Sequence, residues 1–92
     1  MKHNVYFEGN VQSLSFTQLS DESSVGVMSP GEYTFGTAAP EKMSVIKGAL
    51  TIKRDGEADW TTFRDGESFN VTGDSSFQLK VEVATAYLCE YL

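Results

Sequence analysis

The stretch PGEYTFGTAAPEKMSVIKGAL, Pro30 to Leu50, holds two runs of β-strand signals. A Pro-Gly dipeptide opens it as a turn, and the runs YTFGT and MSVIKGAL are rich in the β-branched and aromatic residues that fit a pleated surface. Pro40 lies between the two runs and permits at most one short helical turn there. The stretch therefore predicts two strands joined by a short connection.

The segments on either side have the same character. FQLKVEV, Phe77 to Val83, alternates apolar and polar residues strictly, which is the period of a half-buried strand. Asp55-Gly56 and Asp65-Gly66 separate other apolar runs and are typical of tight turns. SDESS, Ser20 to Ser24, is polar and is expected to form a mobile loop. No window has apolar residues at helical spacing, so we expect an all-β chain of short antiparallel strands.

Length and charge restrict the classes of protein to be considered. A chain of 92 residues predicts one domain, residues 1–92. Its net charge of −6 argues against nucleic acid and anionic membranes as partners, because both attract basic surfaces. The sequence has no signal-peptide pattern and no apolar run of membrane-spanning length, and its single cysteine, Cys89, allows no internal disulfide. These features predict a cytoplasmic protein.

The spacing of residues around Glu41 resembles the first sequence signature of the cupin family. Glu41 stands six residues before Gly48, as the metal-binding glutamate of cupins stands before a glycine. Counting back from Glu41, the two histidine positions of that signature fall on Phe35 and Thr37. The resemblance implies a single-domain, cupin-type jelly-roll β-barrel in which these side chains point inward.

A second cupin signature is matched in outline further along the chain. Gly66 fits its leading glycine, and its histidine position falls on Phe77. Three of the four metal-ligand positions are therefore occupied by two phenylalanines and a threonine, and the only histidine, His3, lies near the N-terminus. Because a metal site needs several N, O or S donors that converge on one point, we expect no metal cofactor.

Longer stretches are similar to the small pyrimidine/purine nucleoside phosphorylases of the cupin type. The resemblance is carried by SVGVMSPGEYTFGTAAPEKMSVIKGAL, FNVTG and AYLCEYL, and it extends from about Tyr6 to Leu92. It implies a pentosyltransferase that cleaves many purine and pyrimidine nucleosides with phosphate, giving free base and ribose 1-phosphate. It also implies a homodimer that uses no cofactor.

This chemistry suggests roles for eight residues. Phosphorolysis builds positive charge on the ribose as the base departs, and phosphate itself is the nucleophile. Glu41, the one inward carboxylate of the predicted frame, is assigned to the ribose hydroxyls and the charge at C1′, with protonation of the base as the alternative. The candidates for substrate binding are Tyr33, Phe35, Thr37, Phe77 and Tyr87. Among the cations Lys47, Arg54 and Arg64, the candidates for phosphate binding are Lys47 and Arg64. The alternative is a set of backbone amides near Gly31, Gly36 or Gly73.

Other interpretations remain open at this point. Phe35 and Phe77 are also ordinary core residues in many strands, and Lys47 and Arg64 also fit a solvated surface. The alternative function is a metal-free cupin module that binds a sugar or nucleotide without catalysis, which the scarcity of inward-facing cations favours. A third possibility is a metal-dependent isomerase or dioxygenase of the ordinary cupin kind, against which the missing ligands count.

Overall fold

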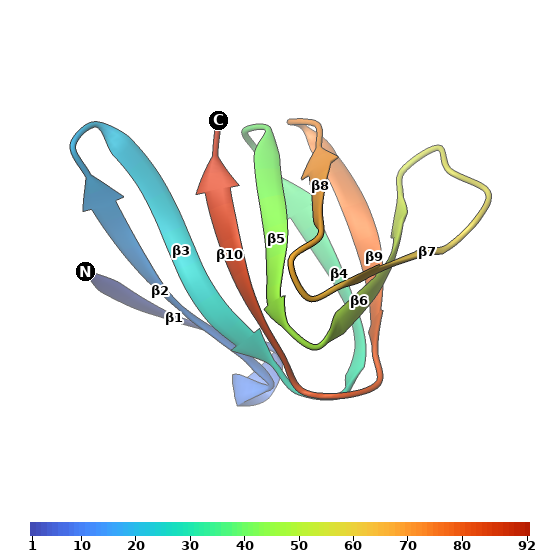
Figure 1. Cartoon of the computed structure of the whole chain (residues 1–92). Helices are drawn as coiled ribbons and strands as arrows, with labels where there is room; N and C mark the ends of the chain where they lie inside the picture. The colour runs from blue at the N-terminus through green and yellow to red at the C-terminus, as the bar shows by residue number, and fades with distance from the viewer.

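The computed structural model describes residues 1–92 and consists of β-strands with one short 3₁₀ helix (Figure 1). The elements are β1 (Lys2–Tyr6), η1 (Phe7–Gly9), β2 (Val11–Gln18), β3 (Asp21–Met28), β4 (Gly31–Thr37), β5 (Glu41–Lys47), β6 (Ala49–Arg54), β7 (Thr61–Arg64), β8 (Ser68–Val71), β9 (Ser75–Val81) and β10 (Thr85–Tyr91). The predicted all-β class is confirmed. No helix has the length and apolar character needed to cross a membrane.

The strands form two antiparallel sheets that lie as layers against each other (Figure 1). The six-stranded sheet has the order β1-β2-β3-β10-β5-β8, and the four-stranded sheet has the order β4-β9-β6-β7. Strands that follow one another in sequence, such as β3 and β4 or β5 and β6, belong to different sheets. This is the jelly-roll arrangement that the cupin spacing predicts, although no ladder joins the two sheets into a closed barrel.

The alternation in the sequence decides which side chains meet between the sheets. Phe77, Leu79 and Val81 of β9 are buried, and they belong to a core cluster of 14 hydrophobic side chains drawn from both sheets. Val83 continues the same alternation in sequence but is 56% exposed, because β9 ends at Val81 and the chain turns toward β10. The prediction for FQLKVEV therefore holds up to the end of the strand.

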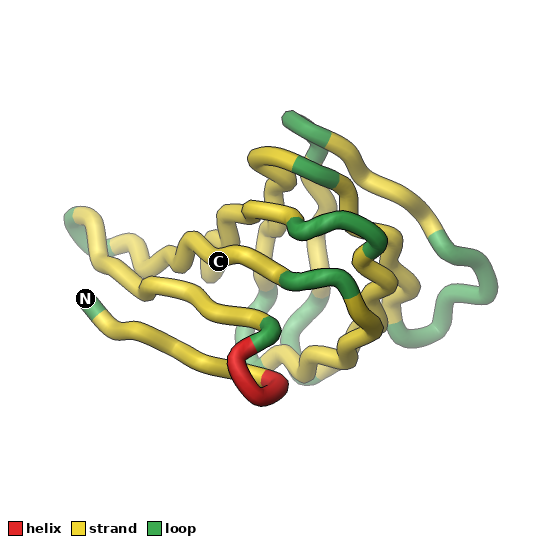
Figure 2. Tube along the Cα trace, turned by 90° about the horizontal axis from the view of Figure 1, so that it is seen from below, coloured by secondary structure: helices red, strands yellow, loops and turns green.

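The SDESS segment is not a loop. Asp21–Ser24 is the first half of β3 and pairs with Ser15–Gln18 of β2, which leaves only Leu19 and Ser20 in the turn. The tip of this hairpin extends away from the second sheet (Figures 1 and 2), and Leu19 is 98% exposed. Asp21 and Glu22 are exposed on opposite faces, and the inward position Ser24 is buried but carries a hydroxyl, so the segment has no apolar alternation and its sequence resembles that of a loop.

The turn between β1 and β2, which forms η1, is a site of backbone strain (Figure 2). Phe7 and Glu8 have φ angles of 50° and 58°, in the left-handed region that bulky residues avoid, and Gly9 follows at 91°. The ring of Phe7 packs against Tyr33 and Phe35 of β4, with centroid distances of 5.0 and 5.3 Å. These contacts hold the end of β1, including Tyr6, against the four-stranded sheet.

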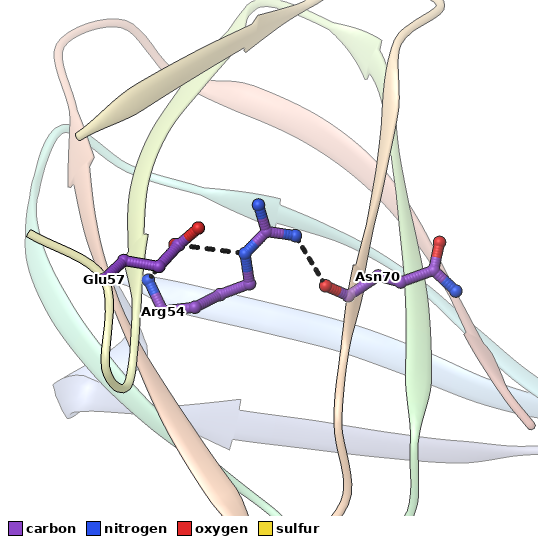
Figure 3. Close-up of polar contacts among 3 residues, drawn as sticks. All are labelled: Arg54, Glu57 and Asn70. Carbon is purple, nitrogen blue, oxygen red and sulfur yellow. Dashed lines mark hydrogen bonds and ion pairs between the residues drawn. The ribbon is translucent and has the colours of Figure 1, made fainter. Parts of the chain in front are cut away.

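Arg54, at the end of β6, makes a polar link between the two sheets (Figure 3). Its Nε donates to Oε1 of Glu57 at 3.1 Å, and its Nη1 donates to the backbone oxygen of Asn70 in β8 at 2.8 Å. The ion pair is partly exposed and screened by solvent, so it contributes little to stability. Its main consequence is that the guanidinium group is already occupied.

Gly26 of β3 allows a tyrosine to lie across the six-stranded sheet. It is paired with Tyr87 of β10 on one side and with Ser13 of β2 on the other. A Cβ atom on Gly26 would lie 2.6 Å from the backbone oxygen of Gln12 and 2.7 Å from the hydroxyl oxygen of Tyr87. The missing side chain therefore leaves the space in which the Tyr87 ring rests.

We predict that Gly26→Ala lowers the free energy of unfolding by about 1–3 kcal/mol, because the methyl group forces the backbone or Tyr87 to move. Gly36→Ala is the matched control, since its nearest contact would be at 3.9 Å, and it should change stability by less than about 0.5 kcal/mol. Urea denaturation of both variants measures the difference. Equal stability of the two variants would contradict this account of Gly26.

Candidate functional site

A cavity lies between the two sheets and is lined by side chains from both. The four-stranded sheet contributes Phe35, Gly36 and Phe77, and the six-stranded sheet contributes the polar members together with further apolar and aromatic side chains. The lining residues are Tyr6, Ser13, Ser24, Met28, Phe35, Gly36, Glu41, Met43, Phe77, Tyr87, Cys89 and Tyr91. The two walls differ in chemistry.

The aromatic wall is formed by Phe35 of β4 and Phe77 of β9. These residues are direct cross-strand partners, and their rings stack with centroids 5.9 Å apart and planes 24° apart. Tyr6 adds its ring edge-on to Phe35 at 6.0 Å. Phe35 and Phe77 form a stacked apolar surface, bordered by Tyr6, and a planar aromatic ligand fits such a surface.

The polar wall is formed by inward positions of β2, β3 and β10. Two of its residues, Ser13 and Ser24, are only 5% and 3% exposed. Tyr87 lies in the same cross-strand row as Ser13, with Gly26 between them, and Cys89 is paired with Ser24. Since side chains alternate along a strand, these residues all face the aromatic wall.

Glu41 begins β5 and lies at one end of the polar wall. It is paired with Tyr91, and its Oε1 accepts a hydrogen bond from Sγ of Cys89 at 3.4 Å. Burial raises the pKa of the Glu41 carboxyl above its ordinary value, and the hydrogen bond from Cys89 acts in the opposite direction. The site therefore contains one half-buried acid that is easier to protonate than an exposed glutamate.

The neighbours of Glu41 stay protonated. Burial, with the charge of Glu41 as a second cause, raises the pKa of the Cys89 thiol to about 12. Burial likewise raises the pKa of the Tyr91 hydroxyl to about 12, and it raises the pKa of Tyr87 further. Cys89 is thus a hydrogen-bond donor and not a thiolate nucleophile at neutral pH.

Of the eight candidates from the sequence, four line the cavity together: Glu41, Phe35, Phe77 and Tyr87. Two others have hydroxyls that the protein itself uses. Tyr33 donates to the backbone oxygen of Ser29 at 2.6 Å, and Thr37 donates to that of Thr72 at 2.6 Å. Neither Tyr33 nor Thr37 lines the cavity.

The candidate cations also lie elsewhere. Lys47 is exposed at the end of β5, where the register between β5 and β10 shifts, so its parity with Glu41 does not bring it inward. Arg64 lies in a separate groove on the four-stranded sheet, with Thr51, Thr62 and Lys80, and Arg54 is occupied by Glu57 (Figure 3). No lysine, arginine or histidine lines the cavity.

Several lining residues were not identified from the sequence. Ser13 shares the parity of buried Val11 in VQSLSF, so a serine at a core-facing position was the available signal. Cys89 and Tyr91 share the parity of Tyr87 in the same way. Tyr6 had no such signal, because it depends on the strained turn that follows it.

The cavity offers few of the donors that a metal site requires. Glu41 and Cys89 are its only lining side chains of the carboxylate, imidazole or thiol type. Across the chain, no group of three or more His, Cys, Asp or Glu side chains lies close enough together to hold a metal ion.

The fold and this cavity define a cupin-type jelly-roll protein with an aromatic site. The fold is shared with the EutQ protein of Clostridium difficile, with a TM-score of 0.72 at 20% identity over 88% of this chain and 67% of that one. A family model described as pyrimidine/purine nucleoside phosphorylase matches residues 1–91, and the chain belongs to this family.

Similar proteins agree with this membership. A relative from Vibrio cholerae named pyrimidine/purine nucleoside phosphorylase is 68% identical over 92 residues, which covers 100% of this chain and 97% of that protein. A crystal structure from Vibrio parahaemolyticus, of a protein described as of unknown function, has a TM-score of 0.97 at 67% identity, covering 99% of this chain and 97% of that one. The relatives thus match in sequence and fold over nearly the whole chain.

Glu41→Gln should be at least as stable as the wild type at pH 8. Because burial raises the pKa of Glu41, the unfolded chain loses this proton at a lower pH than the folded protein, so ionisation disfavours the folded state. The stability gain in the variant should therefore shrink as the pH falls through the raised pKa toward the ordinary value of 4.5. Urea denaturation of both proteins from about pH 4 to about pH 8 measures this difference in the free energy of unfolding.

Glu57→Gln is the control of opposite sign. Hydrogen bonds from Arg54 lower the pKa of Glu57, so this carboxylate stabilises the folded state at pH values above its ordinary pKa, and the contribution is lost on acidification. The Glu57 variant should be the less stable one at pH 8. A stability difference for Glu41→Gln that does not change with pH would contradict the assignment of a raised pKa.

Proposed function

We propose that the protein catalyses phosphorolysis of purine and pyrimidine nucleosides to free base and ribose 1-phosphate. The observation that carries the proposal is the cavity itself, in which stacked phenyl rings on one sheet face a half-buried carboxylate on the other. Family membership and the names of the relatives support it. The proposal goes beyond them in assigning the reaction to these residues.

The aromatic wall is the proposed site for the base. Phe35 and Phe77 offer π-surface and no polar groups that would distinguish one base edge from another. Stacking of this kind tolerates different bases, since every base has a π-face. We therefore expect the protein to accept nucleosides with different bases.

Glu41 is the proposed partner of the ribose. In phosphorolysis a phosphate oxygen forms a bond to C1′ while the C1′–N bond breaks, its electron pair leaves with the base, and the base nitrogen takes a proton. Positive charge develops on the ribose ring during this displacement. An ionised Glu41 stabilises that charge and accepts hydrogen bonds from ribose hydroxyls, in a partly desolvated site where electrostatic interactions are strong. This step uses phosphate as its nucleophile and calls for no metal.

Incubation of the protein with uridine or adenosine should release base and ribose 1-phosphate only when phosphate is present. Glu41→Gln should keep its fold and lose about 100-fold or more in kcat, because the amide cannot supply the negative charge. Glu82→Gln, an exposed glutamate outside the cavity, is the matched control and should keep wild-type activity. Absence of phosphate-dependent product from every common nucleoside would refute the proposed reaction.

A binding module without catalysis is the second candidate function. It is favoured by the lack of any cationic side chain in the cavity, since most phosphate sites use lysine or arginine. It predicts that a sugar or nucleoside raises the melting temperature without being consumed. The assay with uridine and phosphate distinguishes the two functions.

We also propose that two copies associate through the outer face of the six-stranded sheet. Leu14, Val25 and Leu88 form an apolar row across β2, β3 and β10, because they are successive cross-strand partners. Val27 and Ile46, each 52% exposed, add to this row on the side toward Ala86 of β10. We refer to these five residues as the outer apolar face. Their hydrophobic side chains are in contact with water in the single chain, and a second copy would cover them in a symmetric contact.

Val25→Glu should weaken this association at least tenfold, because it places a charge at the centre of the row. Val83→Glu is the control, since Val83 is 56% exposed but lies beyond the end of β9 and outside the outer apolar face. Analytical ultracentrifugation of the three proteins measures the monomer–dimer equilibrium. A monomeric wild type at high concentration, or an unchanged Val25→Glu dimer, would refute the proposed interface.

A further inference from the structure

The polar wall of the cavity ends in a group of hydroxyls that the proposed reaction has not yet used. Ser13, Ser24 and Tyr87 line the cavity, and all three are at least nine-tenths buried. We refer to these three residues as the hydroxyl floor. Buried hydroxyls that face a cavity are poised to bind a polar ligand, because their hydrogen-bonding capacity is not satisfied by bulk water.

Hydrogen bonds within the protein orient the hydroxyl floor. The side-chain amide of Asn4 donates to Oγ of Ser13 at 3.3 Å and to Oγ of Ser15 at 2.8 Å. Ser13 therefore acts as an acceptor toward Asn4, and its own proton is shared with Tyr87 through a side-chain hydrogen bond. Asn4 is in this sense a positioning residue for Ser13.

The other two hydroxyls add further donors. Ser24 and Tyr91 share one hydrogen bond, with oxygens 3.2 Å apart, which leaves the second proton of that pair free. Burial raises the pKa of Tyr87, so its hydroxyl keeps its proton. The Ser13–Tyr87 pair and the Ser24–Tyr91 pair each use one proton internally, so each pair leaves one O–H donor for a ligand, two in all.

The position of the floor suits the nucleophile. In an in-line displacement the entering and leaving groups lie on opposite sides of C1′. The aromatic wall belongs to the four-stranded sheet and the hydroxyl floor to the six-stranded sheet, so a base on the first and a phosphate on the second would have the ribose between them.

Ser13 and Tyr87 lie away from the carboxylate, whereas Ser24 is paired with Cys89, which donates to Glu41, and is the floor residue nearest to it. Glu41 is paired with Tyr91, which lies four residues from Tyr87 along β10, or about 13 Å at the usual rise of a strand. An anion near Ser13 and Tyr87 therefore avoids the close repulsion that a phosphate beside Glu41 would experience.

We propose that the nucleophilic phosphate binds to the hydroxyl floor, held by the neutral O–H groups of Ser13, Tyr87 and Ser24 rather than by lysine or arginine. The proposal rests on the proposed phosphorylase function and names the phosphate subsite within it. No cationic side chain lines the cavity, so within one chain the anion must be held by neutral donors. Hydrogen bonds to a charged partner are stronger than neutral ones, and this holds especially in a site shielded from water.

The test compares Michaelis constants for phosphate and for uridine in wild-type protein, Ser13→Ala and Tyr87→Phe. Each variant loses one donor and should raise the KM for phosphate about tenfold, while the KM for uridine stays within about twofold. Ser23→Ala is the matched control, because Ser23 neighbours Ser24 on β3 but faces the opposite side of the sheet. Thermal unfolding of each variant shows that it is folded.

A second measurement separates the subsite from the reaction. Titration of the protein with inorganic phosphate alone, followed by calorimetry, should show binding to the wild type and binding about tenfold weaker to Ser13→Ala. This result would support the hydroxyl floor even if no nucleoside were cleaved and the proposed phosphorylase function failed.

Three outcomes would overturn the proposal. One is an unchanged KM for phosphate in both variants, and another is a rise confined to the KM for uridine, which would assign the floor to the ribose. The third is a larger rise in the KM for phosphate in Lys47→Ala or Arg64→Ala, which would assign the anion to a surface cation.

Discussion

The site depends on the pairing of the last strand. β10 lies at the centre of the six-stranded sheet, hydrogen-bonded to β3 on one side and to β5 on the other. These ladders bring Glu41 to Cys89 across 48 residues of sequence and Ser24 to Tyr91 across 67. Neither contact exists in any local hairpin, so the polar wall forms only when the C-terminal strand has docked. Such long-range closure makes folding slow and makes the site sensitive to any change that weakens β10.

The aromatic wall and Glu41 of the polar wall have opposite effects on the stability of the fold. Phe35 and Phe77 pack with the core cluster, so their burial stabilises the fold whether or not a ligand is present. Glu41 does the reverse, because its burial disfavours the charged form that the proposed reaction needs. The thiol of Cys89 offsets part of this cost with one hydrogen bond. An acid whose charged form is destabilised by burial is a common feature of functional sites, where residues needed for the reaction lower the stability of the fold.

Strict alternation and motif spacing predict the parts of this structure that depend on one face of a strand. FQLKVEV gives the inward side chains of β9, and the spacing from Glu41 to Gly48 gives the frame in which Phe35, Phe77 and Glu41 converge. The sequence-based predictions fail where the position of a residue depends on both faces of a strand or on a contact that is distant in sequence. SDESS forms a strand start whose exposed and buried positions are both polar, and Lys47 follows a register shift that parity alone does not reveal. Tyr6 reaches the cavity through three successive positive φ angles, which no propensity scale anticipates.

The side chains at the positions where the cupin signatures would place metal ligands form a continuous surface. Phe35 and Phe77 are cross-strand partners, so these two positions carry one stacked pair of rings. Thr37 bonds to Thr72 and Ser75 and closes the sheet edge, which removes the third position from the cavity. Glu41 is then a carboxylate without a cation at its side. In the proposed reaction the missing positive charge comes from the substrate, because the ribose becomes cationic only as the bond to the base breaks. The carboxylate is therefore neutralised at the transition state and not before, which is the condition under which an electrostatic interaction lowers a barrier instead of tightening substrate binding.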